Sequence, residues 1–100
     1  MVVHIVFWRL HEHANGRSKQ ENALEMKRRF EALRQTMPGL LRLDLGIDFA
    51  GTDQSSDVAL YTEFESREAL DAYQAHPAHK EVAAFIADLR SERRVVDYEI

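Results

Sequence analysis

The residues best suited to acid–base chemistry in this chain are its histidines, because imidazole is the side chain that titrates near neutral pH. There are five of them, one near the N-terminus and the others in two pairs: His4, His11 with His13, and His76 with His79. Tyr73 stands three residues before the second pair, and a phenol can donate a hydrogen bond to a developing oxyanion. These residue types suit proton transfer, and imidazoles also bind metal ions.

The histidine spacings give little indication of a metal site. His11-Glu12-His13 places two histidines at i and i+2 in a polar stretch, and no third ligand follows at a suitable spacing. His76 and His79 could chelate a metal on an intact helix, but the proline between them disturbs that geometry. Cysteine is absent, which excludes cysteine-ligated zinc, disulfides and thiolate catalysis. We therefore expect no metal and no cofactor, and any binding by His11 and His13 would be adventitious.

The composition argues against two other classes of function. The formal charge is −4, with a pI near 5.7, whereas a nucleic-acid-binding protein shows a concentrated basic stripe. The basic cluster Lys27-Arg28-Arg29 lies between Glu25 and Glu31 and is typical of a solvated helix face. No apolar run approaches the ~18 residues of a membrane span, and the N-terminus lacks the pattern of a signal peptide. We expect a cytoplasmic protein that binds neither nucleic acid nor membrane.

Hydrophobic patterns in the first half of the chain predict a strand, a helix and a second strand. In residues 2–10 both the odd-numbered and the even-numbered positions are largely apolar, so both faces of this strand should be covered. After a polar loop at residues 11–17, Ser18 and Glu21 fit a capping box. The following helix carries an apolar stripe at spacings of three and four, formed by Ala23, Met26, Phe30, Leu33 and Met37. Pro38-Gly39 ends it, and residues 41–49 alternate as in a strand with one buried face.

The second half of the chain predicts a strand, two helices and a closing strand. A turn at residues 50–56 leads into a strand at residues 57–65. Ser66 can cap a short helix, and His76-Pro77 breaks it, because a residue before proline is disfavoured in the helical region. A further helix begins near Pro77, and residues 94–100 form the last strand. Two acidic residues there are expected to face solvent or to pair with nearby arginines: Asp97 and Glu99, with Arg93 and Arg94.

The resulting order, β-α-β-β-α-α-β, predicts one α+β domain over residues 1–100, with no repeat and no linker. The expected fold is ferredoxin-like, an antiparallel-rich four-stranded sheet with its helices on one face. Crossover helices of this kind lie on the same side of the sheet, which leaves its second face bare. Because residues 2–10 are apolar on both faces, and a large exposed apolar patch is usually an interface, we expect a homodimer packed through the sheet face.

The run Tyr73-Gln74-Ala75-His76-Pro77-Ala78-His79 resembles the most recognisable stretch of the stress-responsive dimeric A/B-barrel (Dabb) family. Four further features of that family occur in order along the chain: His4, Pro38-Gly39, Phe64-Glu65-Ser66 and Val96-Asp97-Tyr98. The resemblance implies the fold expected above, including a dimer in which two sheets close a barrel. Most members of the family have no assigned reaction.

A plant branch of the family contains polyketide cyclases of the olivetolic acid cyclase type, which close a ring by intramolecular aldol condensation without a cofactor. By resemblance, the catalytic residues of that branch fall on His4, Tyr73 and His79. An aldol closure needs a base and a donor to the developing oxyanion, so we expect His79 to be the base, Tyr73 the oxyanion donor, and His4 an orienter or second donor. Further residues are expected to bind a small, mostly apolar molecule between the sheet and the helices: Val6, Trp8, His76 and Phe85.

Two other interpretations remain open. Imidazoles at a helix break commonly bond freed backbone groups, and Tyr73 can simply pack its ring in the core. The protein would then be a non-catalytic structural or stress-related dimer. Alternatively, it is a monooxygenase of the related dimeric α/β-barrel superfamily, as in antibiotic biosynthesis or haem degradation, and a spectrum after addition of haem would test this.

Overall fold

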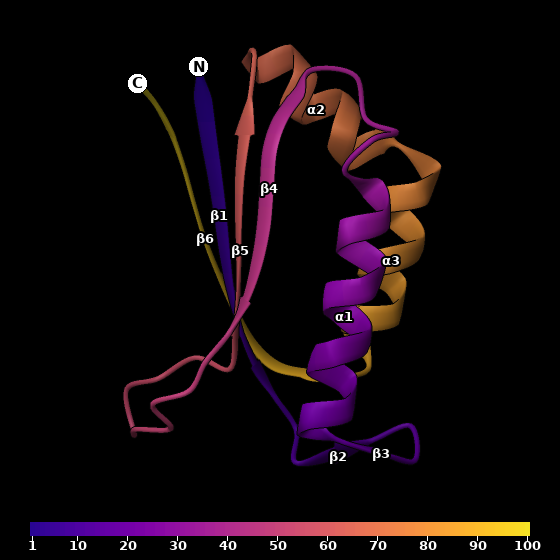
Figure 1. The fold of residues 1–100 in the computed structure, drawn as a ribbon, viewed down its shortest axis with the longest axis vertical. Helices are drawn as coiled ribbons and strands as arrows, with labels where there is room; N and C mark the ends of the chain where they lie inside the picture. The colour runs from indigo at the N-terminus through magenta and orange to yellow at the C-terminus, as the bar shows by residue number, and fades with distance from the viewer.

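The computed structural model describes residues 1–100 as a sheet with its helices on a single face (Figure 1). The elements in chain order are β1 (Val2–Leu10), β2 (His13–Ala14), β3 (Arg17–Ser18), α1 (Lys19–Leu33), β4 (Leu40–Ile47), β5 (Val58–Phe64), α2 (Arg67–Ala75), α3 (Pro77–Ala87) and β6 (Arg90–Glu99). The predicted ferredoxin-like α+β fold is confirmed.

The main sheet has the strand order β4-β5-β1-β6, and every neighbouring pair is antiparallel. β1 is therefore an inner strand, which agrees with the apolar residues on both of its faces. His4 of β1 lies opposite Thr62 of β5 and Asp97 of β6. Because residues directly opposite one another share a face of the sheet, these three side chains all lie on the helix side.

The hydrophobic core lies between this face and the helices. The predicted capping box starts α1, since Ser18 Oγ accepts from the Glu21 N–H at 3.2 Å and Glu21 Oε1 accepts from the Ser18 N–H at 3.0 Å. The helix then buries four residues of the predicted stripe, Ala23, Met26, Phe30 and Leu33. The ring of Phe30 packs against Trp8 of β1, with centroids 5.7 Å apart, and joins α1 to the sheet.

Three details differ from the sequence prediction. The stretch predicted as a loop contains a small hairpin, because Asn15 (φ 51°) and Gly16 (φ 76°) both adopt the left-handed conformation of a type I′ turn. α1 ends at Leu33 and does not reach Met37. β6 begins at Arg90, ahead of the predicted start, because it continues to pair with β1 as far as Leu10.

The opposite face of the sheet has no helix over it (Figure 1). Apolar side chains of β1 and β6 are exposed on this open face, at 39% for Phe7, 47% for Val96 and 45% for Tyr98. These are the residues that alternate with the helix-facing ones, as the register of the two strands shows. The bare apolar face predicted from the sequence is therefore present in the subunit.

Candidate functional site

The break between α2 and α3 positions the candidate histidine of α3. His76 adopts an extended conformation (φ −67°, ψ 135°), as expected of a residue that precedes proline. Its Nδ1 accepts a hydrogen bond from the Ala78 N–H at 3.0 Å and so caps α3. The imidazole of His76 is thus occupied by the helix terminus, while His79 lies in the first turn of α3.

A cavity of about 200 Å³ lies between the sheet and helices α1 and α3. Its apolar wall is formed by residues of β1, β5, α1 and α3: Val6, Trp8, Phe30, Leu60, Ala83 and Ile86. Its polar wall consists of His4, His79, Arg90 and Arg93. Four of the seven residues expected at the site therefore meet around one cavity: His4, Val6, Trp8 and His79.

The other three expected residues, Tyr73, His76 and Phe85, do not line this cavity. Phe85 packs instead beneath the guanidinium of Arg29 on α1, whose Cζ lies 3.8 Å from the ring centroid. The reason is the helical period: Ala83 and Ile86, three residues apart, share the side of α3 that borders the cavity, and Phe85 points elsewhere.

Tyr73 lies behind the cavity wall. Its ring contacts those of Phe64 and His79, at centroid distances of 5.0 Å and 4.4 Å, and its buried hydroxyl has no hydrogen-bond partner. Burial raises the pKa of Tyr73, so the phenol stays protonated at neutral pH. In this arrangement Tyr73 supports the ring of His79, and its hydroxyl is not on the cavity wall.

His4 is buried and is held by Asp97, its neighbour across the β1–β6 pair. Its Nδ1 bonds Asp97 Oδ1, and because an ionised carboxylate only accepts hydrogen bonds, Nδ1 carries the proton. The other ring nitrogen, Nε2, has no protein partner. A carboxylate that fixes one imidazole nitrogen in this way orients the ring and leaves the second nitrogen for chemistry.

Asp97 and Glu99 of β6 are exposed, which is one of the two arrangements predicted for them, and neither pairs with Arg93 or Arg94. The observed pairs are Asp97 with His4, Glu99 with Arg67, and Arg94 with Glu92. The alternation of β6 was predicted, but the residue opposite His4 depends on the strand register, which the pattern of one strand does not specify. The His4–Asp97 pair could therefore not be derived from the sequence.

His79 contributes the second imidazole of the cavity. Its Nδ1 lies 3.3 Å from the carbonyl oxygen of Gln74, and because a carbonyl only accepts, Nδ1 carries the proton and Nε2 has no partner. Burial is the main reason that the pKa of His79 lies below its ordinary value of 6.5; the bond to Gln74 opposes this, and the charges of His4 and Arg93 lower the pKa further. The ring is neutral at pH 7, so Nε2 can act as a base.

Arg90 and Arg93 are cavity residues that were not predicted from the sequence. Both precede residue 94, where the last strand was predicted to begin, so the strand pattern did not place them on a face of the sheet. The remaining cavity residues that were not predicted, Phe30, Leu60, Ala83 and Ile86, are ordinary apolar residues whose patterns indicated only burial or helix.

The structure contains no group of three or more histidine, aspartate or glutamate side chains placed to hold a metal ion. His11 and His13 are both exposed. None of the helices has the length and apolar character needed to cross a membrane.

A four-stranded antiparallel sheet with three helices on one side and an apolar open side defines a ferredoxin-like subunit. Residues 2–100 match the Stress responsive A/B Barrel Domain (Dabb) family, so the chain belongs to this family, as its run from Tyr73 to His79 indicated. No curated protein matches the sequence.

Solved structures with the same fold differ in what they are described to do. A dimeric protein of unknown function from Bacteroides fragilis is 26% identical, with a TM-score of 0.87 and coverage of 99% of this chain and 95% of that one. A dimeric ferredoxin-like protein of unknown function from Thermobifida fusca is 21% identical (TM-score 0.86; 99% and 90%). The hydroxynitrile lyase of Passiflora edulis is 19% identical (TM-score 0.82; 99% and 92%). The similarity to the Thermobifida fusca and Passiflora edulis proteins shows the fold alone.

Proposed function

We propose that the protein is a homodimer whose subunits each bind a small, mostly apolar molecule in the cavity and catalyse a cofactor-free proton transfer on it. The observation that supports this best is the pair of imidazoles on one wall. Each has Nδ1 bonded to an acceptor, Asp97 or the Gln74 carbonyl, and each has Nε2 without a partner. The rest of the wall is largely apolar, which strengthens electrostatic interactions inside the cavity.

In the proposed mechanism, His79 is the base. Its Nε2 lone pair takes a proton from a carbon next to a carbonyl group, and the electrons of the broken C–H bond form the enolate. His4, when protonated, donates its Nε2–H to the enolate oxygen while Asp97 holds its Nδ1–H. Return of the proton from His79 at another position isomerises the molecule. Alternatively, the enolate carbon attacks a second carbonyl and closes a ring, and the alkoxide formed there takes the proton from His79. Tyr73 acts as a positioning residue, through its contact with the His79 ring.

This function is tested by hydrogen–deuterium exchange on an uncharged ketone. Acetophenone is a suitable probe, because its methyl protons are lost to deuterated water only after enolisation. We expect the protein to accelerate the loss of the methyl NMR signal in proportion to its concentration, and free imidazole at the same concentration to give a much slower exchange. Exchange no faster than that of free imidazole would contradict the proposal and would favour the non-catalytic dimer.

The homodimer is proposed to form through the open face. Phe7, Val96 and Tyr98 provide a contiguous apolar surface there, and exposed apolar patches of this kind are typical of interfaces. The Bacteroides fragilis and Thermobifida fusca proteins, which share this fold, are described as dimeric. Packing two such faces together would bury the apolar residues that the helices leave uncovered.

A charge placed on the open face is expected to separate the subunits. Val96→Asp should shift the mass measured by light scattering from that of a dimer towards that of a monomer, because an unpaired carboxylate would be buried in the interface. Val95→Asp is the matched control, since Val95 is equally exposed (48% against 47%) but lies opposite Val6, on the helix side. A Val96→Asp protein that remains a dimer, or equal dissociation of both variants, would show that the interface lies elsewhere.

A further inference from the structure

The cavity wall is positively charged in a protein that is negatively charged overall. The formal charge of the chain is −4, yet no aspartate or glutamate lines the cavity, whereas the guanidinium groups of Arg90 and Arg93 do. A cleft lined by one sign of charge concentrates ligands of the opposite sign. The wall therefore favours an anion over a neutral or cationic molecule.

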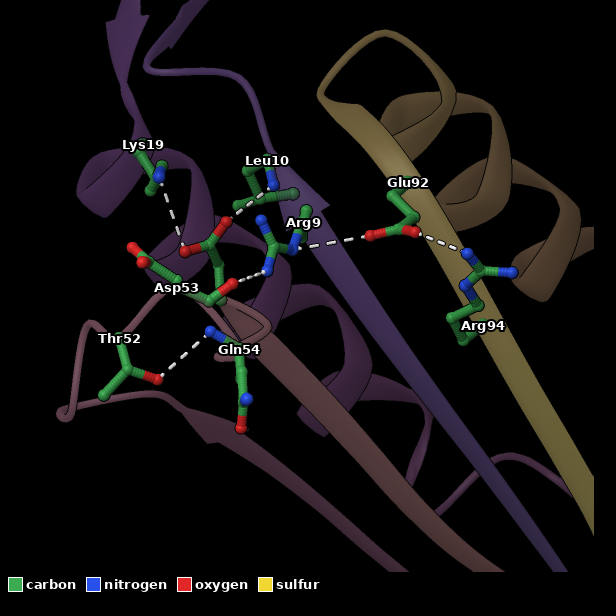
Figure 2. Close-up of polar contacts among 9 residues, drawn as sticks. Arg9, Leu10, Lys19, Thr52, Asp53, Gln54, Glu92 and Arg94 are labelled. Atoms are coloured by element: carbon green, nitrogen blue, oxygen red, sulfur yellow. Dashed lines mark hydrogen bonds and ion pairs between the residues drawn. The ribbon is translucent and has the colours of Figure 1, made fainter.

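The two guanidinium groups of the cavity have no protein partner. Seven of the ten arginines bond a carboxylate or a carbonyl oxygen, and the three that do not are Arg17, Arg90 and Arg93. The nearby carboxylate of β6, Glu92, is engaged by Arg9 and Arg94, as Figure 2 shows. The guanidinium groups of Arg90 and Arg93 are thus free to bind a ligand.

A β-bulge brings these two arginines to the same face of the sheet. In a regular strand, residues three apart point to opposite faces. The neighbouring residues Arg9 and Leu10 of β1 pair with Glu92 and Arg90 of β6. Ser91, which lies between these two, is an additional residue without a partner in β1. The extra residue changes the alternation, and Arg90 and Arg93 both reach the cavity. Bulges are common next to functional sites, where they redirect a side chain.

We infer that the ligand of this cavity is a small molecule with a carboxylate at one end and an apolar body, and that Arg90 and Arg93 bind the carboxylate. The inference rests on the proposed function and adds the chemical class of the ligand. A guanidinium group matches a carboxylate with two parallel N–H···O bonds, which a lone ammonium cannot do. The apolar body lies against the wall that includes Trp8, Phe30 and Ile86.

The size of the cavity limits the ligand further. Sites for drug-sized molecules usually enclose ~300–1,000 Å³, and this cavity encloses about 200 Å³. A single ring or a short chain with one carboxylate fits that volume better than an extended polyketide does. Bound in this way, the anion would also compensate the positive charge that Arg93 places near His79.

The inference is tested by comparing the binding of benzoate and benzamide to the intact protein by calorimetry. The two probes have nearly the same shape and differ in charge. We expect benzoate to bind about tenfold more tightly or better, because hydrogen bonds to charged groups are the stronger ones. Arg90→Gln and Arg93→Gln should each remove most of this difference and leave benzamide binding unchanged. Both side chains are exposed, so neither variant is expected to impair folding, which circular dichroism would verify.

Arg17→Gln is the matched control. It removes the same charge from the third unpartnered arginine, which lies in the hairpin strand β3 and not in the cavity. Benzoate affinity should stay within about twofold of the wild type in this variant.

An equal loss in Arg17→Gln, equal affinity for benzoate and benzamide, or no binding of benzoate would overturn the inference. Inorganic phosphate binding as tightly as benzoate would also overturn it, because the apolar body would then contribute nothing. Acetophenone exchange is measured separately, and its presence shows that the proposed function survives.

Discussion

Replacing His79 by glutamine is expected to lower the rate of acetophenone exchange by about 10²–10⁴-fold, the usual contribution of a positioned general base. Glutamine keeps a polar side chain of similar length but has no lone pair basic enough to accept a proton from carbon. The fold should be retained, because His79 makes only one hydrogen bond, to the Gln74 carbonyl. The methyl signal of acetophenone, followed by NMR at pH 7, measures the change.

Two controls separate a base from a structural histidine. His13→Gln removes an exposed imidazole outside the cavity and should leave the exchange rate unchanged. The wild-type rate should rise as the pH is raised through the pKa of His79, which burial places below 6.5, because the base is active only when it is neutral. An unchanged rate in His79→Gln, or a wild-type rate that does not rise with pH in the range below 6.5, would contradict the assignment of His79 as the base.

Replacing Phe30 by alanine is expected to lower the free energy of unfolding by about 3–5 kcal/mol, the usual cost of removing a buried aromatic ring. Phe30 is 2% exposed and packs against Trp8, so it holds α1 to the sheet and at the same time forms part of the cavity wall. For a domain whose total stability is of the order of 5–15 kcal/mol, this is a large fraction. Urea unfolding followed by circular dichroism measures it.

Leu24→Ala is the control for this substitution, because Leu24 lies on the same helix and is 55% exposed. Its stability should change by less than about 0.5 kcal/mol. If Phe30→Ala were no more destabilising than Leu24→Ala, the packing of α1 on the sheet described above would be incorrect. In the absence of denaturant, where the Phe30→Ala protein remains folded, the enlarged cavity of this variant should accept bulkier ketones than the wild-type cavity does.

The elements of this fold could be predicted because their signals are local. The capping box at Ser18 and the break at His76-Pro77 each depend on a few neighbouring residues, and each lies where the sequence placed it. The alternation along β4 is confirmed only in its middle, where Leu43 and Leu45 are buried, whereas Leu41 is exposed beyond a register shift and Phe49 is exposed beyond the end of the strand. The hairpin was missed although Asn15-Gly16 favours a type I′ turn, because its strands are only two residues long and lack the apolar alternation that indicates a strand.

The polar wall of the cavity was only partly predictable, because it depends on relations between strands. The partner of His4 is set by the register of β1 against β6, and the direction of Arg90 is set by a bulge in the same pair. Neither property is encoded in the periodicity of one segment. Tyr73 is a different case: the residue type suggested an oxyanion donor, whereas packing places its hydroxyl in the core, without a partner.

Long-range ¹H–¹⁵N spectra of the histidine rings show whether His4 and His79 present free Nε2 atoms to one ligand. At pH 7 we expect His79 to be the tautomer with the proton on Nδ1, because the Gln74 carbonyl can only accept. Addition of acetophenone should shift the Nε2 resonances of both His4 and His79 and leave those of His11 and His13 in place. A proton on Nε2 of His79, or a response from only one of the two cavity rings, would contradict a shared ligand site of His4 and His79.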